Sequence, residues 1–335
     1  MINIFVGLSN NQVRNYENLV PILEKGNHIL IANKGVHVNK NLFSEVIYSR
    51  ISLNNQSNGS IDAITNIIRK IKEYQLILDK IIRYKEEKNI SLYFTSLEDI
   101  LANYLFFSFN KNMKTYVVED GTLNYYYHSI ENLSLNKMWL KKIISYLYGI
   151  RYVIYKGHSS GIEYEKVKKQ YVRSPELSIC PEKSVSLPYL KRKTQLNNSV
   201  LIIGQEPYIH HFGKELYIER LKELCDLAKQ NDSYIDSKRV YYKPHRNGER
   251  IDYDVLIAEF ENKEVCVLSS EKSLEDLYFD ELGAGSVYSF DSSALLNIYL
   301  EADDDVRGDI KFYVLLKYNK LLKPIFKRFK FEVFE

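Results

Sequence analysis

The sequence predicts an α/β protein with parallel sheets, because short apolar runs and amphipathic helices alternate along the chain. Residues 2–6, 28–32, 91–94 and 115–118 are short, mainly apolar runs, and each is followed by polar or glycine-containing residues. Between the second and third runs, apolar side chains recur at helical spacing over residues 61–82. This alternation favours parallel strands with helices on both faces of the sheet.

A change in composition near the middle of the chain predicts a second domain. Four of the seven prolines lie between Pro175 and Pro207, and residues 191–198 are mostly polar. The α/β pattern then restarts with an apolar run at residues 200–203, a helical pattern at 214–230 and a strand pattern at 240–242. We therefore expect α/β domains over residues 1–185 and 195–310, followed by a basic helix over residues 311–335.

Composition excludes several classes of protein. With 335 residues, 27% charged side chains and a net charge of +3, the chain is typical of a globular protein, and bulk charge gives no reason to expect nucleic acid. The three cysteines are widely spaced and form no CxxC pair, which favours a reducing cytoplasm over a disulfide scaffold. No apolar run reaches the ~20 residues of a membrane span. Asp303, Asp304 and Asp305 predict a solvated turn, and no metal site is expected.

Two carboxylates leave the strand predicted at residues 115–118. Glu119 and Asp120 are followed by Gly121, which can adopt positive φ and turn the chain toward a cleft. A carboxylate at a strand end can act as a general base on a hydroxyl or hold that hydroxyl by hydrogen bonds. The alternative is an ordinary acidic turn.

A second candidate follows the strand predicted at residues 240–242. There Lys243, Pro244, His245 and Arg246 place a histidine between two cations at a strand exit. Ligands of open α/β sheets bind outside the carboxyl ends of the strands, so this group predicts a receiver of negative charge such as phosphate. An ordinary surface turn is the alternative.

Three further features of the second half point to a nucleotide. Gly204 and Gln205 end an apolar run at a point where the backbone can approach a ligand, and Ser292 with Ser293 opens a predicted helix, where free N–H groups and the helix dipole attract anions. Glu275 is a candidate for binding ribose hydroxyls. The alternatives are a tight turn, an N-cap serine and a solvated carboxylate.

Taken in order, these segments resemble the bacterial sialyltransferases of GT-B architecture, in the lipooligosaccharide, capsule and O-antigen group. That group carries an acidic motif ending in glycine, matched by Glu119-Asp120-Gly121, and a Ser/Thr pair, matched by Ser292-Ser293. Its His-Pro motif is matched by Lys243-Pro244-His245-Arg246, in which proline precedes the histidine instead of following it. The resemblance covers residues 90–300.

The resemblance implies two Rossmann-like domains facing each other across a cleft, with the acceptor bound by residues 1–185 and a CMP-sugar by residues 195–310. It implies inverting transfer of sialic acid from CMP-Neu5Ac to a hydroxyl, such as that of galactose, on a bacterial surface glycan. Asp120 would be the base, and His245, Ser292 and Ser293 would donate to the leaving phosphate. No metal or other cofactor is implied. Two alternatives stay open: a transferase for another CMP-activated acid, such as Kdo or legionaminic acid, and a non-catalytic nucleotide- or glycan-binding protein.

Two basic amphipathic stretches, residues 136–152 and 311–331, predict peripheral contact with an anionic membrane on its cytoplasmic side. Trp139 and Phe326 are the side chains expected at the lipid interface. The lysines and arginine expected to face lipid are Lys137, Lys141, Lys142, Lys323, Lys327, Arg328 and Lys330. The alternative is a pair of helices that cover the core and expose charged faces to water.

Overall fold

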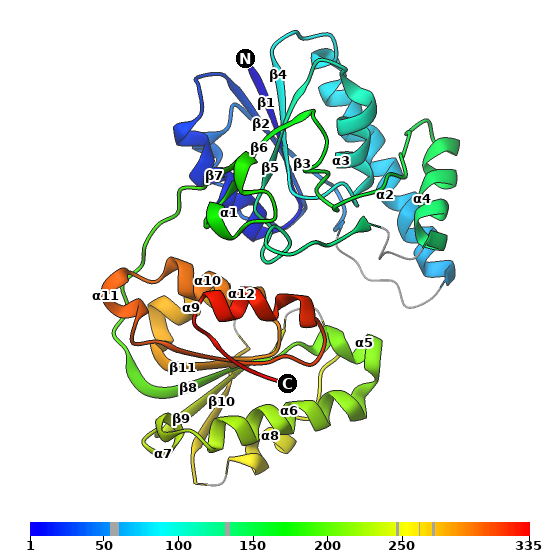
Figure 1. The fold of residues 1–335 in the computed structure, drawn as a ribbon. Helices are drawn as coiled ribbons and strands as arrows, with labels where there is room; N and C mark the ends of the chain where they lie inside the picture. Colours follow the sequence, from blue (N-terminus) through cyan, green and yellow to red (C-terminus); the bar gives the residue numbers. More distant parts are fainter. Residues whose placement is uncertain (54–59, 131–134, 246–247, 261, 270–271) are drawn as a thin grey trace. The chain divides into compact units, whose positions relative to one another are not determined.

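The computed structural model of the chain describes residues 1–53, 60–130, 135–245, 248–260, 262–269 and 272–335. The chain divides into two compact units, Met1–Tyr189 and Leu190–Glu335 (Figure 1). Each unit contains one sheet, and in both sheets every adjacent pair of strands is parallel within the described residues.

The first unit is built on a sheet to which the described residues contribute seven strands, in the order β3-β2-β1-β4-β5-β6-β7. The strands are β1 (Ile2–Gly7), β2 (Asn27–Ala32), β3 (Glu45–Tyr48), β4 (Ile90–Phe94), β5 (Lys114–Val118), β6 (Val167–Val172) and β7 (Ser184–Ser186). The helices are α1 (Asn10–Leu19), α2 (Ser60–Ile81), α3 (Ile100–Tyr104) and α4 (Leu135–Leu147).

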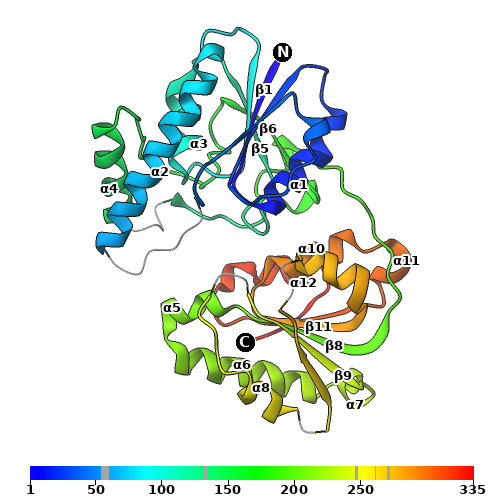
Figure 2. The same cartoon turned by 180° about the vertical axis from the view of Figure 1, so that it is seen from behind.

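Both faces of this sheet are buried, which explains why its strands are almost continuously apolar. Successive strand residues point to opposite faces, so Ile4 belongs to the core beneath α2, α3 and α4, whereas Phe5 belongs to the core beneath α1. The Phe5 ring packs against the rings of Tyr16 from α1 and Tyr93 from β4. The helices therefore cover the sheet on both sides (Figure 2).

The second unit has a sheet to which the described residues contribute six strands, in the order β10-β9-β8-β11-β12-β13. The strands are β8 (Asn197–Ile203), β9 (Arg239–Lys243), β10 (Glu264–Val267), β11 (Ala284–Ser289), β12 (Lys311–Leu315) and β13 (Glu332–Phe334). The helices are α5 (Ile209–Phe212), α6 (Lys214–Lys229), α7 (Asp232–Ile235), α8 (Asp254–Glu259), α9 (Leu274–Leu277), α10 (Ser293–Glu301), α11 (Asp304–Arg307) and α12 (Lys323–Arg328). Helices α6 and α8 cover one face, and α9, α10 and α12 cover the other (Figure 1).

The two sheets are wound in the same way. In each, the chain starts in an inner strand, adds two strands on one side, and then returns to continue on the other side. The direction of winding therefore reverses between β1 and β4 in the first unit and between β8 and β11 in the second. In doubly wound sheets, the crevice at the carboxyl ends of these two strands is where ligands bind.

The prediction of a single basic helix over residues 311–335 is wrong. This segment belongs to the second sheet, where β12 and β13 flank the short helix α12. Its apolar run, Phe312 to Leu315, is buried as a strand, and Pro324 lies in the first turn of α12 instead of interrupting a longer helix. Phe326 is fully buried, so it cannot lie at a lipid interface as predicted. Within the described part of the chain, no helix combines the length and the apolar character that a membrane crossing requires.

Candidate active site

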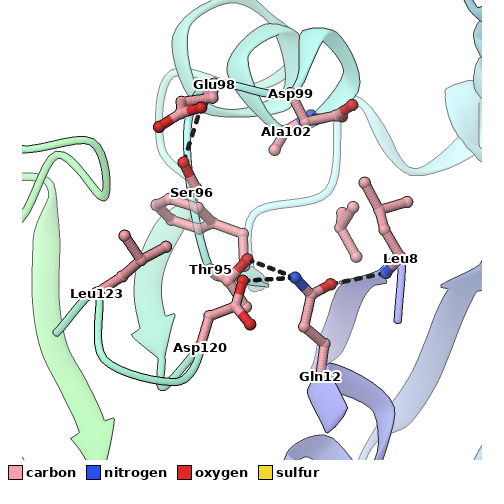
Figure 3. A pocket seen from close by; sticks show the side chains of 11 residues that line it. Leu8, Gln12, Thr95, Ser96, Glu98, Asp99, Ala102, Asp120 and Leu123 are labelled. Carbon is pink, nitrogen blue, oxygen red and sulfur yellow. Dashed lines mark hydrogen bonds between the residues drawn. The ribbon is translucent and has the colours of Figure 1, made fainter. Parts of the chain in front are cut away.

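A cavity of about 200 Å³ lies at the reversal point of the first sheet, beside the carboxyl ends of β1 and β4 (Figure 3). Its polar wall consists of Gln12, Thr95, Ser96, Glu98, Asp99 and Asp120, and its apolar wall of Val6, Leu8, Phe94, Ala102 and Leu123. Asp120 reaches the cavity from β5, the strand paired with β4. That strand ends at Val118, and Glu119 and Asp120 are the two residues that follow it. The cavity therefore brings the predicted base to the place where the topology predicts a ligand.

Asp120 is held in this cavity by hydrogen bonds from two directions. Its backbone N–H donates to Asn124 Oδ1 at 3.0 Å, and its Oδ2 accepts from Gln12 Nε2 at 2.8 Å. Burial raises the pKa of the Asp120 carboxyl above its usual range, and hydrogen bonding to Gln12 and Thr95 opposes that rise. A half-buried carboxylate with a raised pKa and an adjoining cavity is suited to take a proton from a hydroxyl.

Gln12 is a residue of this site that the sequence analysis missed. Its Oε1 accepts the backbone N–H of Leu8 at 2.7 Å, which leaves its Nε2 to donate to Thr95 Oγ1 at 3.1 Å and to Asp120. Ser9 caps α1 by accepting the backbone N–H of Gln12, so the helix start sets the position of the amide. The spacing Ser-x-x-Gln directly after the first strand is a capping-box pattern, and it could have identified Gln12.

Glu119, predicted to bind substrate, is fully buried and lies outside the cavity lining. Its Oε2 accepts from Tyr125 Oη at 2.5 Å and from the backbone N–H of Arg173 at 2.7 Å, and its Oε1 accepts from Arg173 Nε at 2.7 Å and also from Arg173 Nη2. The carboxylate is thus occupied by protein donors. We assign it a positioning role, since it fixes the end of β5 from which Asp120 projects.

The turn after Asp120 is shaped by a glycine and a buried histidine. Gly121 has φ of +58°, a conformation that favours glycine. From a later segment of the chain, His158 packs against this turn. It is fully buried, and its Nε2 lies 3.1 Å from Leu123 O and 3.3 Å from Tyr126 O. Burial lowers the pKa of His158, so the neutral ring holds these carbonyls and keeps Leu123 in the cavity wall.

We expect replacement of Gln12 with leucine to shift the pH dependence of any reaction that uses Asp120 as a base. The amide hydrogen bond favours the ionised carboxylate, so its loss should raise the pKa of Asp120 further. Because the base acts in its ionised form, the acidic limb of the kcat/KM profile should move to higher pH. The measurement is the pH–rate profile, supported by ¹³C NMR titration of the Asp120 carboxyl, which needs no turnover.

Gln75→Leu is the matched control, because Gln75 Nε2 donates at 2.7 Å to a backbone carbonyl, that of Tyr148, remote from the carboxylate. An acidic limb at the wild-type position in Gln12→Leu, together with an unchanged carboxyl titration, would exclude this role for Gln12.

In the second unit, the parallel register brings the predicted donor residues to one sheet edge. Ile203 of β8 is paired with Lys243 of β9 on one side and with Ser289 of β11 on the other. The segments that follow these strands therefore leave the sheet at the same edge. They contain Gly204 with Gln205, then His245, and then Ser292 with Ser293.

Glu206 anchors this edge and was also missed by the sequence analysis. It is buried, and its two oxygens accept from Tyr242 Oη at 2.5 Å and from the backbone N–H of His245 at 2.6 Å. Burial raises the pKa of Glu206, an effect that these hydrogen bonds oppose. Gly204 is required by the same packing, since a Cβ there would lie 2.3 Å from Tyr242 Oη. The glycine is thus explained by internal packing as well as by access for a ligand.

Lys243 is half-buried beside this anchor. Burial lowers its pKa, as does Arg250, while Glu206 raises it. Arg246, the second cation predicted beside His245, lies outside the described residues.

The helix start at Ser292 is confirmed. Ser292 is the N-cap of α10, and its Oγ accepts the backbone N–H of Ala294 at 3.3 Å, while Ser293 is the first residue of the helix. The preceding Asp291 is buried, which raises the pKa of its carboxyl, and it accepts from Tyr208 Oη at 2.6 Å.

Glu275, the predicted ribose ligand, lies on α9 with only 5% of its surface exposed. Its Oε1 accepts from Asn297 Nδ2 of α10 at 2.6 Å. This bond ties α9 to the helix that Ser292 caps, so Glu275 has a structural role whether or not it also binds ribose. Among the described residues, no three His, Cys, Asp or Glu side chains form a group that could hold a metal ion.

The sequence matches no protein-family model and no curated protein. Two solved structures are similar to this chain over most of its length. UGT89C1 of Arabidopsis thaliana, complexed with UDP-L-rhamnose, is similar over 99% of this chain and 84% of its own, with 9% identity and a TM-score of 0.50. UGT2 of Phytolacca americana, complexed with UDP-2fluoro-glucose and pterostilbene, covers 97% of this chain and 83% of its own, with 8% identity and a TM-score of 0.47.

These identities are too low to carry a function from one protein to the other, and the likeness concerns the fold. Together with the two parallel sheets, the likeness to UGT89C1 identifies a two-domain α/β fold of the GT-B class. The fold class predicted from the sequence is therefore confirmed.

Proposed function

We propose that this protein is a metal-independent, inverting sialyltransferase that moves sialic acid from CMP-Neu5Ac to a hydroxyl, such as that of galactose, on a bacterial surface glycan. The broader part of this proposal, glycosyl transfer, is supported by the GT-B fold. The observation that carries the catalytic part is Asp120, a half-buried carboxylate with a raised pKa that lines a cavity. The sialic acid donor and the glycan rest on the sequence resemblance.

In this proposal Asp120 takes the proton of the acceptor hydroxyl as that oxygen attacks the anomeric carbon of the donor. The bond from this carbon to the CMP phosphate breaks as the new glycosidic bond forms, so a single displacement inverts the configuration. The cavity of about 200 Å³ beside Asp120 has room for part of a sugar ring. Gln12 keeps the carboxylate oriented, and Glu119 fixes the strand end that carries it.

The leaving group would be stabilised by the second unit. Negative charge grows on the CMP phosphate as the bond breaks, and hydrogen-bond donors placed there lower the barrier. The imidazole of His245, the hydroxyls of Ser292 and Ser293 and the free N–H groups at the start of α10 supply donors of this kind. Lys243 adds a cation near the same sheet edge. Since CMP has one phosphate, these groups are expected to suffice without a metal.

Two other functions compete with this one. A different CMP-activated acid, such as Kdo or legionaminic acid, would use the same base and the same phosphate donors. A non-catalytic protein would bind CMP or a glycan without turnover. UGT89C1 was solved with UDP-L-rhamnose, so UDP-sugars are a further class of donor to compare.

A donor screen separates these possibilities. The protein is incubated in EDTA with simple galactosides and, in turn, CMP-Neu5Ac, CMP-Kdo, CMP-legionaminic acid and UDP-sugars, and products are read by mass spectrometry. We expect a sialylated galactoside from CMP-Neu5Ac alone, at a rate that EDTA does not change. Activity that returns only with Mg²⁺ or Mn²⁺ would contradict the metal-free mechanism. Product formed from another donor would show that the transferred sugar is that donor's and not sialic acid. CMP binding without turnover of any donor would indicate a binding protein.

His245→Ala should lower kcat about a hundredfold, the effect of losing one donor to a developing oxyanion. The loop is tied to Glu206 through the backbone N–H of His245, so alanine keeps that anchor. The measurement compares kcat for CMP-Neu5Ac and for a donor with a better leaving group. The activated donor should recover much of the loss, because it depends less on stabilisation of the phosphate.

Glu206→Gln is the contrasting variant, because its amide nitrogen cannot accept, so only one of the two bonds from Tyr242 and His245 can be kept. It should lower the melting temperature and reduce activity equally with both donors. If His245→Ala behaved in that way, the imidazole would be bracing the loop and would have no role at the phosphate.

A further inference from the structure

Helix α4 of the first unit exposes an unusually apolar face. Its outward side chains are Leu135 (59% exposed), Trp139 (52%), Ile143 (56%), Tyr146 (77%) and Leu147 (74%). They follow one another at intervals of three or four residues, with Leu147 beside Tyr146, so they form one stripe along the helix. Single exposed apolar residues need no explanation, but a contiguous stripe of large ones marks a surface that binds something.

Packing among the described residues of the first unit does not account for this stripe. The opposite side of α4, with Met138, Ile144 and Ser145 buried, already packs toward α2 and the core. The helix lies at the outer side of the unit beside α2 in both views (Figures 1 and 2). An apolar outer face on a helix whose inner face is already packed requires a further partner.

The charges around the stripe identify the chemistry of that partner. Helix α4 contains no aspartate or glutamate, while Lys137 and Lys142 are exposed on it. Lys142 Nζ lies 4.6 Å from the centre of the Trp139 ring. Burial lowers the pKa of Lys141, which lies on the inner side of α4. Asp99 and Glu98 oppose this shift, and the smaller effects of Lys70 of α2 and Lys137 add to it. Apolar and aromatic side chains flanked by cations are the composition of interfacial helices that bind anionic lipid.

We propose that the exposed face of α4 docks on an anionic membrane surface, with the helix lying in the plane of the interface. Its 13 residues span about 20 Å, which is short of the ~30 Å hydrocarbon layer and suits an interfacial helix. Leu135, Trp139, Ile143, Tyr146 and Leu147 enter the lipid, while Lys137 and Lys142 meet the headgroups. Each cation near such a surface raises the partition coefficient about fivefold.

The docking face is physically linked to the cavity that holds Asp120. From the inner side of α4, Lys141 Nζ donates to the backbone carbonyl of Glu98 at 2.8 Å, and Glu98 lines the cavity. His128 also contacts Glu98, with its Nε2 3.3 Å from the carboxylate. Docking through α4 would therefore place the cavity close to the membrane. That an acceptor reaches it on a lipid carrier rests on the proposed function, whereas the docking itself does not.

The experiment uses the full chain and its single tryptophan, Trp139, as a built-in reporter. The protein is mixed with vesicles of phosphatidylcholine alone or with one third phosphatidylglycerol, and binding is read by flotation and by tryptophan emission. With anionic vesicles we expect flotation, a shift of emission to shorter wavelength and quenching by brominated lipid. Both binding and shift should weaken as salt concentration rises.

Two matched double variants locate the surface. Ile143→Ser with Leu147→Ser should weaken partition about tenfold or more, through loss of buried apolar area. Ile235→Ser with Leu321→Ser changes side chains of similar exposure (67% and 59%) in the second unit and should leave partition unchanged. Lys137→Gln with Lys142→Gln should reduce binding to anionic vesicles and remove much of its salt dependence.

Three results would overturn the proposal. The first is no flotation and no emission shift with anionic vesicles. The second is flotation that the α4 variants leave unchanged, which would place the lipid contact elsewhere. The third is self-association without vesicles, abolished by Ile143→Ser with Leu147→Ser, which would make the stripe an interface between copies of this chain. None of these measurements uses transfer activity, so the donor screen can succeed or fail independently.

Discussion

Replacement of Asp120 with asparagine or alanine is expected to abolish transfer while binding of CMP survives nearly intact. Asp120 lines a cavity of the first unit, whereas the predicted phosphate ligands belong to the second. Asparagine keeps the size of the side chain and can still accept from Gln12, but it cannot take up the acceptor proton. The measurements are product formation by mass spectrometry and CMP affinity by calorimetry. Substantial residual turnover in both variants would remove Asp120 from the role of base.

Asp120→Asn should not be less stable than the wild type, so a loss of activity in this variant can be distinguished from unfolding. Burial raises the pKa of Asp120 in the folded state, so the fold binds this proton more tightly than the unfolded chain does. The contribution of this group to the free energy of unfolding is therefore most favourable at low pH and is lost as the pH rises through the raised pKa. At neutral pH the ionised carboxylate disfavours folding, and Asp120→Asn should melt at the wild-type temperature or above it.

Arg173→Met is expected to produce the largest loss of stability, about 3–5 kcal/mol in the free energy of unfolding. The variant leaves the carboxylate of Glu119 buried with two fewer hydrogen bonds and without the opposite charge of Arg173. Removing one member of a buried ion pair is costly because the remaining charge stays out of water. The measurement is urea unfolding followed by circular dichroism.

Two companion variants test the cause. Arg173→Met with Glu119→Gln removes both charges and should recover much of the loss. Arg83→Met breaks an exposed pair with Glu45 and should leave the unfolding midpoint nearly unchanged. Equal losses in the single and double variants would show that packing of the arginine stem matters more than its charge.

The periodicity of the sequence was sufficient to predict the α/β class, because strands buried on both faces are apolar throughout and helices are not. It was also sufficient to place Asp120 and Ser292, since polar residues that closely follow a buried strand leave the sheet at its carboxyl end. It failed over residues 311–335, where the lysines between apolar residues imitate an amphipathic helix. Burial of Phe312 and Val314 in the sheet outweighed that local pattern.

Partners distant in sequence could not be predicted. Arg173 lies 54 residues from Glu119, and Gln12 lies 108 residues from Asp120. No local pattern connects them, and only the strand order brings β1, β5 and β6 close enough for these contacts. Glu206 was missed for another reason: a glutamate after a turn resembles a solvated surface residue, and its burial depends on Tyr242 of the adjacent strand.

The common winding of the two sheets has a consequence for protein engineering. Each set of site residues is carried by connecting segments that follow strands of its own sheet, and each sheet has its own hydrophobic core. Segments after β1, β4 and β5 can therefore be exchanged without repacking the core beneath β8, β9 and β11. Under the proposed function, a library that varies the first group would explore new acceptors at constant donor chemistry, and one that varies the second would explore new donors. The two libraries could then be recombined as modules.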